Sequence, residues 1–411
     1  MLSAVLFAGL GLLLLWALAN ALLMLVYRRE LRCLWREPVF RHPVLIIESD
    51  DWGAGPLAQA AALHDIAEVL GRYRDRCGRA PTFSLALVLA VADGPAIAAS
   101  GSYRQRSLDD ALFEPVLAAL RSGQSRGLFS LQLHGMVHYW PAALMACSDV
   151  TVKDWLHQPV PSATEQLPSH LQSRWCDSTR LPSSPHGSAD IRAAVADEVH
   201  AFTRILGQAP QVVVPPTFVW TRDTELAWAE QGLAFIVTPG WRYTARDAKG
   251  VPSGDEGPIA NGDRAGPLTY LRRLDYFEPA RDRDAAHALA VLERAASEGR
   301  PCVLENHRDN FINALPMREH SLAELDKLYR GALARHGDLR FLSSVELGRI
   351  LRDRDPRWLI TRAGERLPHL GERLRHSGRC WKLMTLSGLA AIVNAAAPRS
   401  AEPGQPNPPP G

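Results

Sequence analysis

The sequence VLIIESDDWG at residues 44–53 constrains the fold more than any other stretch. Its apolar half, bounded by Pro43, is typical of a buried parallel strand whose carboxyl end opens into a site. Two adjacent carboxylates cannot both be ionised comfortably there unless a cation or a hydrogen-bond network compensates one of them. We therefore expect Asp51 to bind a metal ion and Asp50 to act as a base. The alternative is that this pair caps the following helix.

A pair of histidines follows a second predicted strand. The apolar run at 128–133 leads directly into HGMVH, which places His134 and His138 four residues apart. This separation puts both imidazoles on one side of a helical turn, as metal-binding pairs require. One carboxylate and two histidines would give a divalent ion, most simply Zn²⁺, three protein ligands and leave positions open for water and substrate. The predicted metal ligands are therefore Asp51, His134 and His138.

These residues resemble the motifs of the polysaccharide deacetylase family, which is also called the NodB homology domain or carbohydrate esterase family 4. The first motif of that family typically reads TFDDG and the second reads HSxxH, where this chain has SDDWG at 49–53 and HGMVH at 134–138. An inserted tryptophan and a glycine in place of serine indicate a divergent member, which the apolar amino-terminal segment discussed below would anchor in a membrane. The resemblance implies an α/β fold, a distorted (β/α)7-type barrel, and hydrolysis of the N-acetyl group of an amino sugar.

Two further motifs of the family are only partly present. The stretch LENH at 304–307 resembles the last motif, Leu-x-His, and implies that His307 is the general acid that protonates the departing amine. The third motif usually supplies an arginine that orients the base, but this chain has VPPT at 214–217 instead. Arg222 is a candidate replacement for that arginine, and Asp275 is a candidate to support His307. The predicted catalytic residues are Asp50 and His307.

Aromatic and polar side chains beside the predicted strand ends are candidates for contact with a sugar. An aromatic ring offers a flat apolar surface to a sugar face, although aromatic residues also fill protein cores. A backbone N–H near Thr217 would help to hold an oxyanion, and the residues after His307 either bind substrate or form a turn. The predicted substrate-binding residues are Trp52, Tyr139, Thr217, Trp220, Arg308 and Asn310.

Predicted strands and helices alternate seven or eight times across residues 43–355, which indicates parallel strands joined by crossover helices. Periodicity alone does not distinguish a seven-stranded barrel from an eight-stranded barrel or an open sheet. The alternation of strand and helix patterns is interrupted at residues 140–187, which are interpreted as an insertion over the mouth of the site. Beyond the catalytic barrel, we expect a helical extension at 356–396, in which residues 381–393 form an interfacial or docking helix, and a disordered Pro-rich tail at 397–411.

The amino-terminal segment is predicted to cross a membrane. Residues 2–26 are almost entirely apolar and uncharged, and at about 1.5 Å per residue they suffice for a hydrocarbon core of about 30 Å. A cleaved signal peptide is disfavoured because no basic residue precedes the apolar run. We assign residues 1–27 to a transmembrane anchor and 28–42 to a basic juxtamembrane linker. The arginines of that linker favour a cytoplasmic catalytic domain, whereas many polysaccharide deacetylases act outside the cell.

Charge and cysteine usage limit the possible partners. A formal net charge of +2 argues against a nucleic-acid binder, and six scattered cysteines suggest reduced thiols. We expect a single-pass protein of the bacterial inner membrane that uses a divalent metal, Zn²⁺ in the simplest case, to deacetylate an amino sugar in a cell-envelope glycan or its precursor. Two alternatives stay open: a catalytically degenerate, membrane-tethered carbohydrate-binding protein, and a metal hydrolase that acts on another bond.

Overall fold

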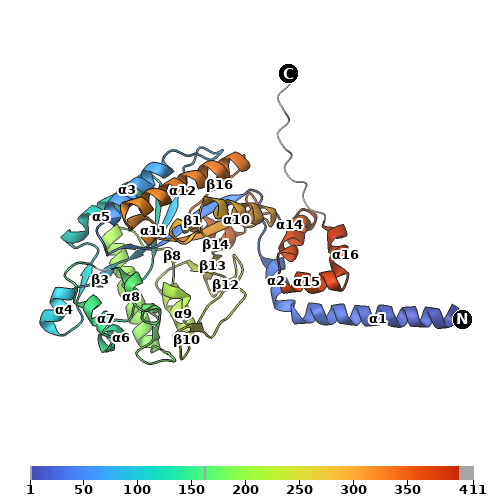
Figure 1. Cartoon of the computed structure of the whole chain (residues 1–411), viewed down its shortest axis with the longest axis horizontal. Coiled ribbons are helices and arrows are strands. Elements are labelled where there is room, and N and C mark those ends of the chain that lie inside the picture. The colour runs from blue at the N-terminus through green and yellow to red at the C-terminus, as the bar shows by residue number, and fades with distance from the viewer. Residues whose placement is uncertain (1, 162, 398–411) are drawn as a thin grey trace, which may run out of the picture.

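A curled parallel sheet surrounded by helices forms the centre of the protein (Figure 1). The computed structural model describes residues 2–161 and 163–397, so the predicted tail at 397–411 lies outside the described residues apart from Ala397. The strands that follow one another around the sheet are β13 (Leu268–Arg272), β9 (Phe235–Thr238), β8 (Val212–Val213), β5 (Phe129–Leu133), β2 (Phe83–Val88), β1 (Val44–Gly53), β15 (Cys302–His307) and β14 (Asp275–Tyr276). All of these neighbours pair in parallel.

The sheet is closed by one continuous segment. Strands β13 and β14 lie at opposite ends of the strand order, yet only two residues separate them in the chain. The backbone N–H of Arg273 donates to Thr238 on β9 at 2.8 Å, and that of Leu274 donates to Val303 on β15 at 2.8 Å. The segment therefore pairs first with one edge of the sheet and then with the other, which gives seven strand positions around the barrel. The predicted (β/α)7-type fold is confirmed.

Helices cover the outside of the barrel between successive strands (Figure 1). A short β16 (Arg340–Phe341) pairs with the start of β1, and β12 (Arg264–Ala265) pairs with β13 in antiparallel fashion. Ser343 forms a capping box with Glu346 at the start of the last barrel helix. No helix lies between β9 and β13, where the chain makes a surface excursion that includes β10 (Ala245–Arg246) and β11 (Pro252–Ser253). The barrel helices are α3 (Gln59–Leu70), α5 (Glu114–Ser125), α8 (Ser188–Leu206), α9 (Arg222–Glu230), α10 (Ala285–Ser297), α12 (Leu315–Arg335) and α13 (Ser344–Asp353).

The predicted insertion at 140–187 lies over the carboxyl ends of the strands. It contains α6 (Pro141–Ala146), α7 (Val150–Leu156) and the small ribbon of β6 (Cys176–Asp177) and β7 (Ser184–Pro185). Side chains from this segment contact the loops that follow β5, β8 and β15. The insertion therefore forms a roof over the edge of the sheet where the predicted site residues lie. Shorter pieces elsewhere are α4 (Gly94–Ser100), α11 (Asp309–Ile312), β3 (Ala90–Ala92) and β4 (Gln105–Ser107).

The two ends of the described chain meet outside the barrel. Helix α1 (Leu2–Val26) extends away from the barrel (Figure 1), and its residues Leu6–Val26 are long and apolar enough to cross a membrane. The predicted linker is largely helical, because α2 (Arg28–Arg36) follows α1 directly. The predicted carboxyl-terminal extension forms α14 (Ala363–Arg375), α15 (Arg379–Leu386) and α16 (Leu389–Ala396), which lie beside α1 and α2.

Candidate metal and catalytic site

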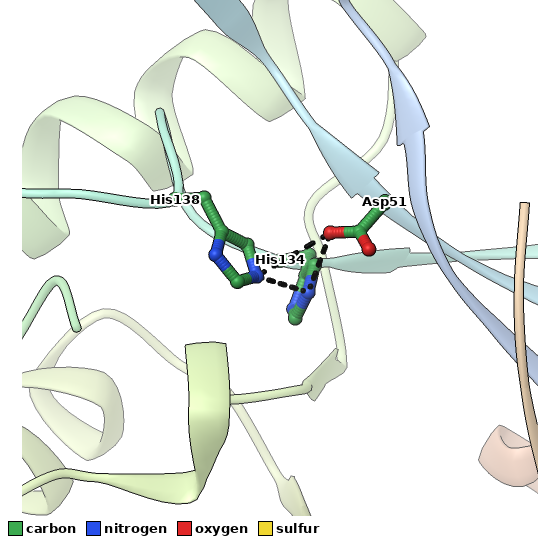
Figure 2. Close-up of side chains that lie close together, drawn as sticks. All are labelled: Asp51, His134 and His138. Atoms are coloured by element: carbon green, nitrogen blue, oxygen red, sulfur yellow. Dashed lines mark hydrogen bonds and ion pairs between the residues drawn. The ribbon is translucent and has the colours of Figure 1, made fainter. Parts of the chain in front are cut away.

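Three predicted metal ligands converge at the carboxyl ends of β1 and β5 (Figure 2). An Oδ1 atom of Asp51 lies 3.5 Å from Nε2 of His134 and 3.3 Å from Nε2 of His138, and the two Nε2 atoms are 3.1 Å apart. All three side chains are buried. The sequence prediction that these residues share one place in the fold is therefore met by the geometry.

The backbone of β1 is distorted at Asp51, near the carboxyl end of the strand. The register between β1 and β2 shifts between Ser49 and Trp52, and Asp51 has a positive φ of 70°. Such a bulge re-aims a side chain, and a strained non-glycine residue held by its surroundings is typical of functional sites. Gly53 is required two residues later, because a Cβ atom there would lie 2.4 Å from the carbonyl oxygen of Val88.

The histidine loop is fixed by hydrogen bonds from outside the site. Nδ1 of His134 lies 2.7 Å from the carbonyl oxygen of Val214, so an N–H there donates to that carbonyl and leaves Nε2 facing Asp51. The backbone N–H of Met136 donates to Glu198, and Gly135 supplies a φ of 93° that a serine would adopt only with strain. The glycine in the second motif is therefore explained by the turn that directs both imidazoles inward.

The three residues fit a divalent ion. Ligand atoms bound to zinc at about 2.0–2.2 Å in a tetrahedron lie roughly 3.3–3.6 Å apart, close to the separations found here. Oδ1 of Asp51 is buried without a hydrogen-bond partner, which is costly for a carboxylate oxygen unless a cation occupies the space before it. Burial lowers the pKa of His138 to about 3, so its imidazole is neutral at physiological pH, as a metal ligand must be.

The carboxylate of Asp50 is held by an arginine that the sequence analysis did not single out. Nη1 and Nη2 of Arg273 donate to the two carboxylate oxygens of Asp50 at 2.7 and 2.6 Å. Burial alone would raise the pKa of Asp50, but the charge and hydrogen bonds of Arg273 lower it, so Asp50 stays ionised. The suggestion that Arg222 takes this role is wrong, because Arg222 begins α9 and the guanidinium on Asp50 comes from the segment that closes the barrel.

Arg273 also compensates two other buried acids inside the barrel. Its Nε donates to Glu48 at 2.7 Å, and its Nη1 lies 3.3 Å from Glu305. Burial and the charge of Asp50 raise the pKa of Glu305 despite the nearby guanidinium. One guanidinium therefore faces three carboxylates and joins them at the carboxyl end of the barrel.

His307 lies at the end of β15, beside Asp50 in the register between β1 and β15. Its Nδ1 is 2.5 Å from Glu278, and its Nε2 is 3.7 Å from Glu305. Burial alone would lower the pKa of His307, but the hydrogen bond with Glu278 and the neighbouring carboxylates raise it to about 10. The suggested support from Asp275 is wrong, since Asp275 pairs with His287 at 3.1 Å and Glu278 is the partner of His307.

Four of the predicted substrate-binding residues pack inside the protein. The indoles of Trp52 and Trp220 are fully buried and donate to Ser49 and Glu225, at 2.8 and 3.0 Å. The hydroxyl of Tyr139 pairs with Tyr103, and the amide of Asn310 donates to the carbonyl oxygen of His307. None of these side chains presents a free face or polar group to a sugar, so for Trp52, Tyr139, Trp220 and Asn310 the prediction is wrong. Their aromatic and amide groups stabilise the strand ends instead.

The other two predicted substrate-binding residues join the roof to the barrel. Arg308 donates to both oxygens of Glu165 at 2.9 Å, while its Nη1 is buried without a partner. The hydroxyl of Thr217 pairs with Ser173 at 3.0 Å, and Thr217 has a positive φ of 52°. Their contact with a substrate remains a prediction.

Of the two site residues that were not predicted, Arg273 left a partial signal in the sequence. Two consecutive arginines, Arg272 and Arg273, stand in the middle of the stretch LTYLRRLDY at 268–276, whose other residues are typical of a buried strand. A buried arginine in a strand requires a carboxylate partner, and unpartnered acids were already predicted at the end of β1. Glu278 left no comparable signal, because a single acid in a loop is ordinary surface chemistry.

Comparison with known proteins gives similarity at the level of structure only. A scan against protein-family models and a search of curated proteins both find no match. A protein of Mycobacterium smegmatis that is provisionally named a polysaccharide deacetylase is 12% identical, with 77% of this chain and 94% of that chain covered and a TM-score of 0.44. The peptidoglycan deacetylase of Bacillus subtilis is 10% identical, with coverage of 77% and 95% and a TM-score of 0.37.

A third similar structure has a different name. The 4-alpha-glucanotransferase of Thermococcus litoralis is 12% identical over 75% of this chain, with a TM-score of 0.39. This chain spans 40% of the length of that enzyme. Identities of 10–12% and TM-scores below 0.5 leave the activity to be argued from the residues of the site.

Proposed function

We propose that this protein is a metal-dependent hydrolase that removes the N-acetyl group from an amino sugar of a cell-envelope glycan or its precursor. The observation that supports the proposal is that a set of candidate metal ligands and a pair of candidate proton-transfer residues lie together at the carboxyl ends of the strands. A carboxylate and two imidazoles converge with an unpartnered oxygen between them. Beside them lie an ionised carboxylate, Asp50, and a histidine, His307, whose pKa is raised.

The proposed metal ligands are Asp51, His134 and His138. The chemistry that a divalent ion supplies at such a site is Lewis acidity, which polarises a carbonyl group and acidifies water. The donor set of one carboxylate and two imidazoles is suited to zinc and also to other first-row metals.

The proton transfers fall to the chain's own side chains. Asp50 accepts a proton from the attacking water as the new carbon–oxygen bond forms, and Arg273 keeps the carboxylate in position for this step. His307 then donates a proton to the amide nitrogen as the carbon–nitrogen bond breaks, so that acetate and a free amine leave. Glu278 supports this role because its carboxylate stabilises the protonated imidazole.

A catalytically degenerate binding protein is the main alternative that the sequence left open. The sequence left this alternative open because the third motif lacks the arginine whose charge would orient and tune the catalytic base. Arg273 supplies a guanidinium to Asp50 from the segment between β13 and β14, which favours the enzyme over the binding protein. A hydrolase acting on another bond would use the same groups, so the substrate test has to separate amide from ester and glycosidic substrates.

The test is a turnover assay on the purified full-length protein with a divalent metal added. The substrates are N-acetylglucosamine oligomers, peptidoglycan fragments and a UDP-linked N-acetyl amino sugar, with O-acetylated xylan as the ester comparison. We expect release of acetate and of a free amine from at least one N-acetyl substrate, and its loss in Asp50→Asn. Release from the ester alone, or binding without release from any substrate, would contradict the proposal.

A further inference from the structure

The carboxyl-terminal helices α15 and α16 form a short hairpin. Each has eight residues, and the turn between them consists of Ser387 and Gly388, where Gly388 has a φ of 79°. Both ends of the hairpin lie near α14. Helix α15 begins shortly after α14 ends, and Arg375 at the end of α14 donates to Asn394 at 3.0 Å and to the carbonyl oxygen of Ala397 at 2.5 Å, at the end of α16. The chain therefore leaves α14, turns at residues 387–388 and returns to α14.

The tip of this hairpin contacts the middle of the apolar helix α1. The indole Nε1 of Trp16 donates to the carbonyl oxygen of Ser387 at 2.6 Å, and the hydroxyl of Ser387 donates to Oδ1 of Asn20 at 2.7 Å. Buried apolar residues of the hairpin, among them Met384 and Ala390, pack with Leu23. Figure 1 shows α15 alongside the part of α1 that is nearest α2, with α16 rising from the far end of α15.

We infer that the α15–α16 hairpin is a re-entrant membrane element that inserts beside α1 from the domain side. Trp16 precedes the end of α1 at Val26 by ten residues, so the tip lies about 15 Å below the membrane surface if α1 spans the bilayer. An eight-residue arm reaches about 12 Å, far less than a hydrocarbon core of about 30 Å, so the hairpin enters the membrane without crossing it.

The polar contacts at the tip are those that a lipid environment demands. The turn exposes backbone groups that water cannot reach inside a bilayer, and non-helical backbone is tolerated there only when protein groups satisfy it. Trp16 satisfies the carbonyl group of Ser387, and the Ser387 hydroxyl satisfies Asn20, a polar side chain that is costly in a spanning helix without a partner. The hairpin tip and the middle of α1 therefore satisfy each other's polar groups.

The outer surface of the hairpin is suited to lipid. Leu386 is 83% exposed at the tip, and Leu383 and Ile392 are also exposed. No acidic residue occurs between 377 and 397, whereas Arg379 and Lys382 stand in the first turn of α15, at the end nearest the headgroups. Basic side chains at that level extend toward anionic headgroups, while the leucines contact acyl chains.

The hairpin position is rigidly tied to the catalytic domain. Arg373 on α14 is buried and donates to the carbonyl oxygens of Glu298, Glu37 and Pro38. A signal peptide that is cut off would leave Ser387 and the apolar residues around it without their partner helix. The inference therefore also implies that α1 stays attached as an anchor in the mature protein.

Cysteine labelling of the full-length protein in vesicles of phosphatidylcholine and phosphatidylglycerol tests the insertion. In a background of Cys77→Ser and Cys147→Ser, Leu386→Cys is compared with Val150→Cys, because Leu386 and Val150 are 83% and 67% exposed outside a membrane. We expect a membrane-impermeant maleimide to label the Leu386→Cys protein at least ten times more slowly than the Val150→Cys protein. Labelling rates within a factor of ten of each other would overturn the inference.

Oxidative cross-linking in the same vesicles tests the contact with α1. The pair Asn20→Cys and Ser387→Cys is expected to form a disulfide, whereas Leu15→Cys with Ser387→Cys, whose first residue is exposed on the same helix, is not. Intact mass of the membrane-extracted wild-type chain gives a second reading that needs no variant and is expected to include residues 2–26. A mass without that segment, or equal cross-linking of both pairs, would overturn the inference.

Discussion

The two halves of the candidate site differ in how completely the protein satisfies them. Between Asp51 and the two imidazoles, Oδ1 of Asp51, which faces both Nε2 atoms, is buried without a hydrogen-bond partner. Around Asp50, both carboxylate oxygens accept hydrogen bonds from Arg273, and Nδ1 of His307 pairs with Glu278. The polar groups of the first half lack a partner unless a cation is bound, whereas those of the second half are paired with charged groups of the chain itself.

This difference indicates a division of labour between the halves. Groups that transfer protons need defined protonation states, and neighbouring charges provide these before any ligand binds. Groups that bind a metal must instead keep their lone pairs free and pointed at one place. Substitutions in the two halves are therefore expected to have separable effects.

Asp50→Asn gives the sharpest separation and the largest expected effect. The variant keeps the shape of the side chain but removes the base, so kcat is expected to fall about 10²–10⁴-fold. Metal content is expected to stay at the wild-type value, because Asp51 and the histidines are unchanged. Steady-state kinetics and elemental analysis of the same preparation measure both quantities. A loss of metal in this variant would show that metal binding and proton transfer are not separable.

Arg273→Met tests whether the proton-transfer half is a balanced charge cluster. The substitution leaves three buried carboxylates without their shared cation, and breaking such a cluster costs about 3–5 kcal/mol of folding free energy. Urea denaturation followed by circular dichroism is the measurement. Glu230→Gln, which removes an exposed ion pair with Arg192, is the control and is expected to cost less than about 1 kcal/mol. Equal effects of the two variants would contradict the account.

Glu278→Gln tests how His307 is kept protonated. A general acid works below its folded pKa, and activity is lost as pH rises through that value. Because the hydrogen bond with Glu278 raises the pKa of His307, the neutral glutamine is expected to move the alkaline limb of kcat/KM down by about 1–3 pH units. The acid limb is expected to stay in place. An unchanged alkaline limb would remove His307 from the proposed role.

Trp52→Phe has the smallest expected effect and separates core packing from sugar binding. The substitution removes a buried indole hydrogen bond to Ser49 and some volume, at a cost of about 1–2 kcal/mol in stability. Because Trp52 is fully buried, KM for the substrate is expected to remain within about twofold of the wild type. A tenfold higher KM with unchanged stability would restore Trp52 to the substrate-binding surface.

Local patterns in the sequence were sufficient for the α/β class and for the meeting of Asp51, His134 and His138, whereas the seven-stranded barrel was implied by the family resemblance and not by periodicity. The alternation of strands and helices indicates parallel strands, and the carboxyl ends of such strands meet at one edge of the sheet. Asp51, His134 and His138 stand directly at such ends, so their meeting was predictable without knowing the order of the strands.

The proton-transfer half was only partly predictable because it depends on how the barrel closes. Arg273 reaches Asp50 only because its segment pairs with both β9 and β15, a long-range arrangement that no local pattern records. The aromatic residues Trp52 and Trp220 failed as predictions for a related reason. Burial decides whether an indole forms core or surface, and residue type at a strand end does not determine burial.

Metal content provides the most direct test of the central claim that Asp51, His134 and His138 bind one divalent ion. The measurement is the stoichiometry of bound metal in wild type, Asp51→Ala, His138→Ala and Asp50→Asn after dialysis against Zn²⁺ and removal of the excess. The account predicts about one ion per chain in wild type and in Asp50→Asn, with near-complete loss in the other two variants. Substoichiometric metal in wild type, or equal metal in all four proteins, would contradict it.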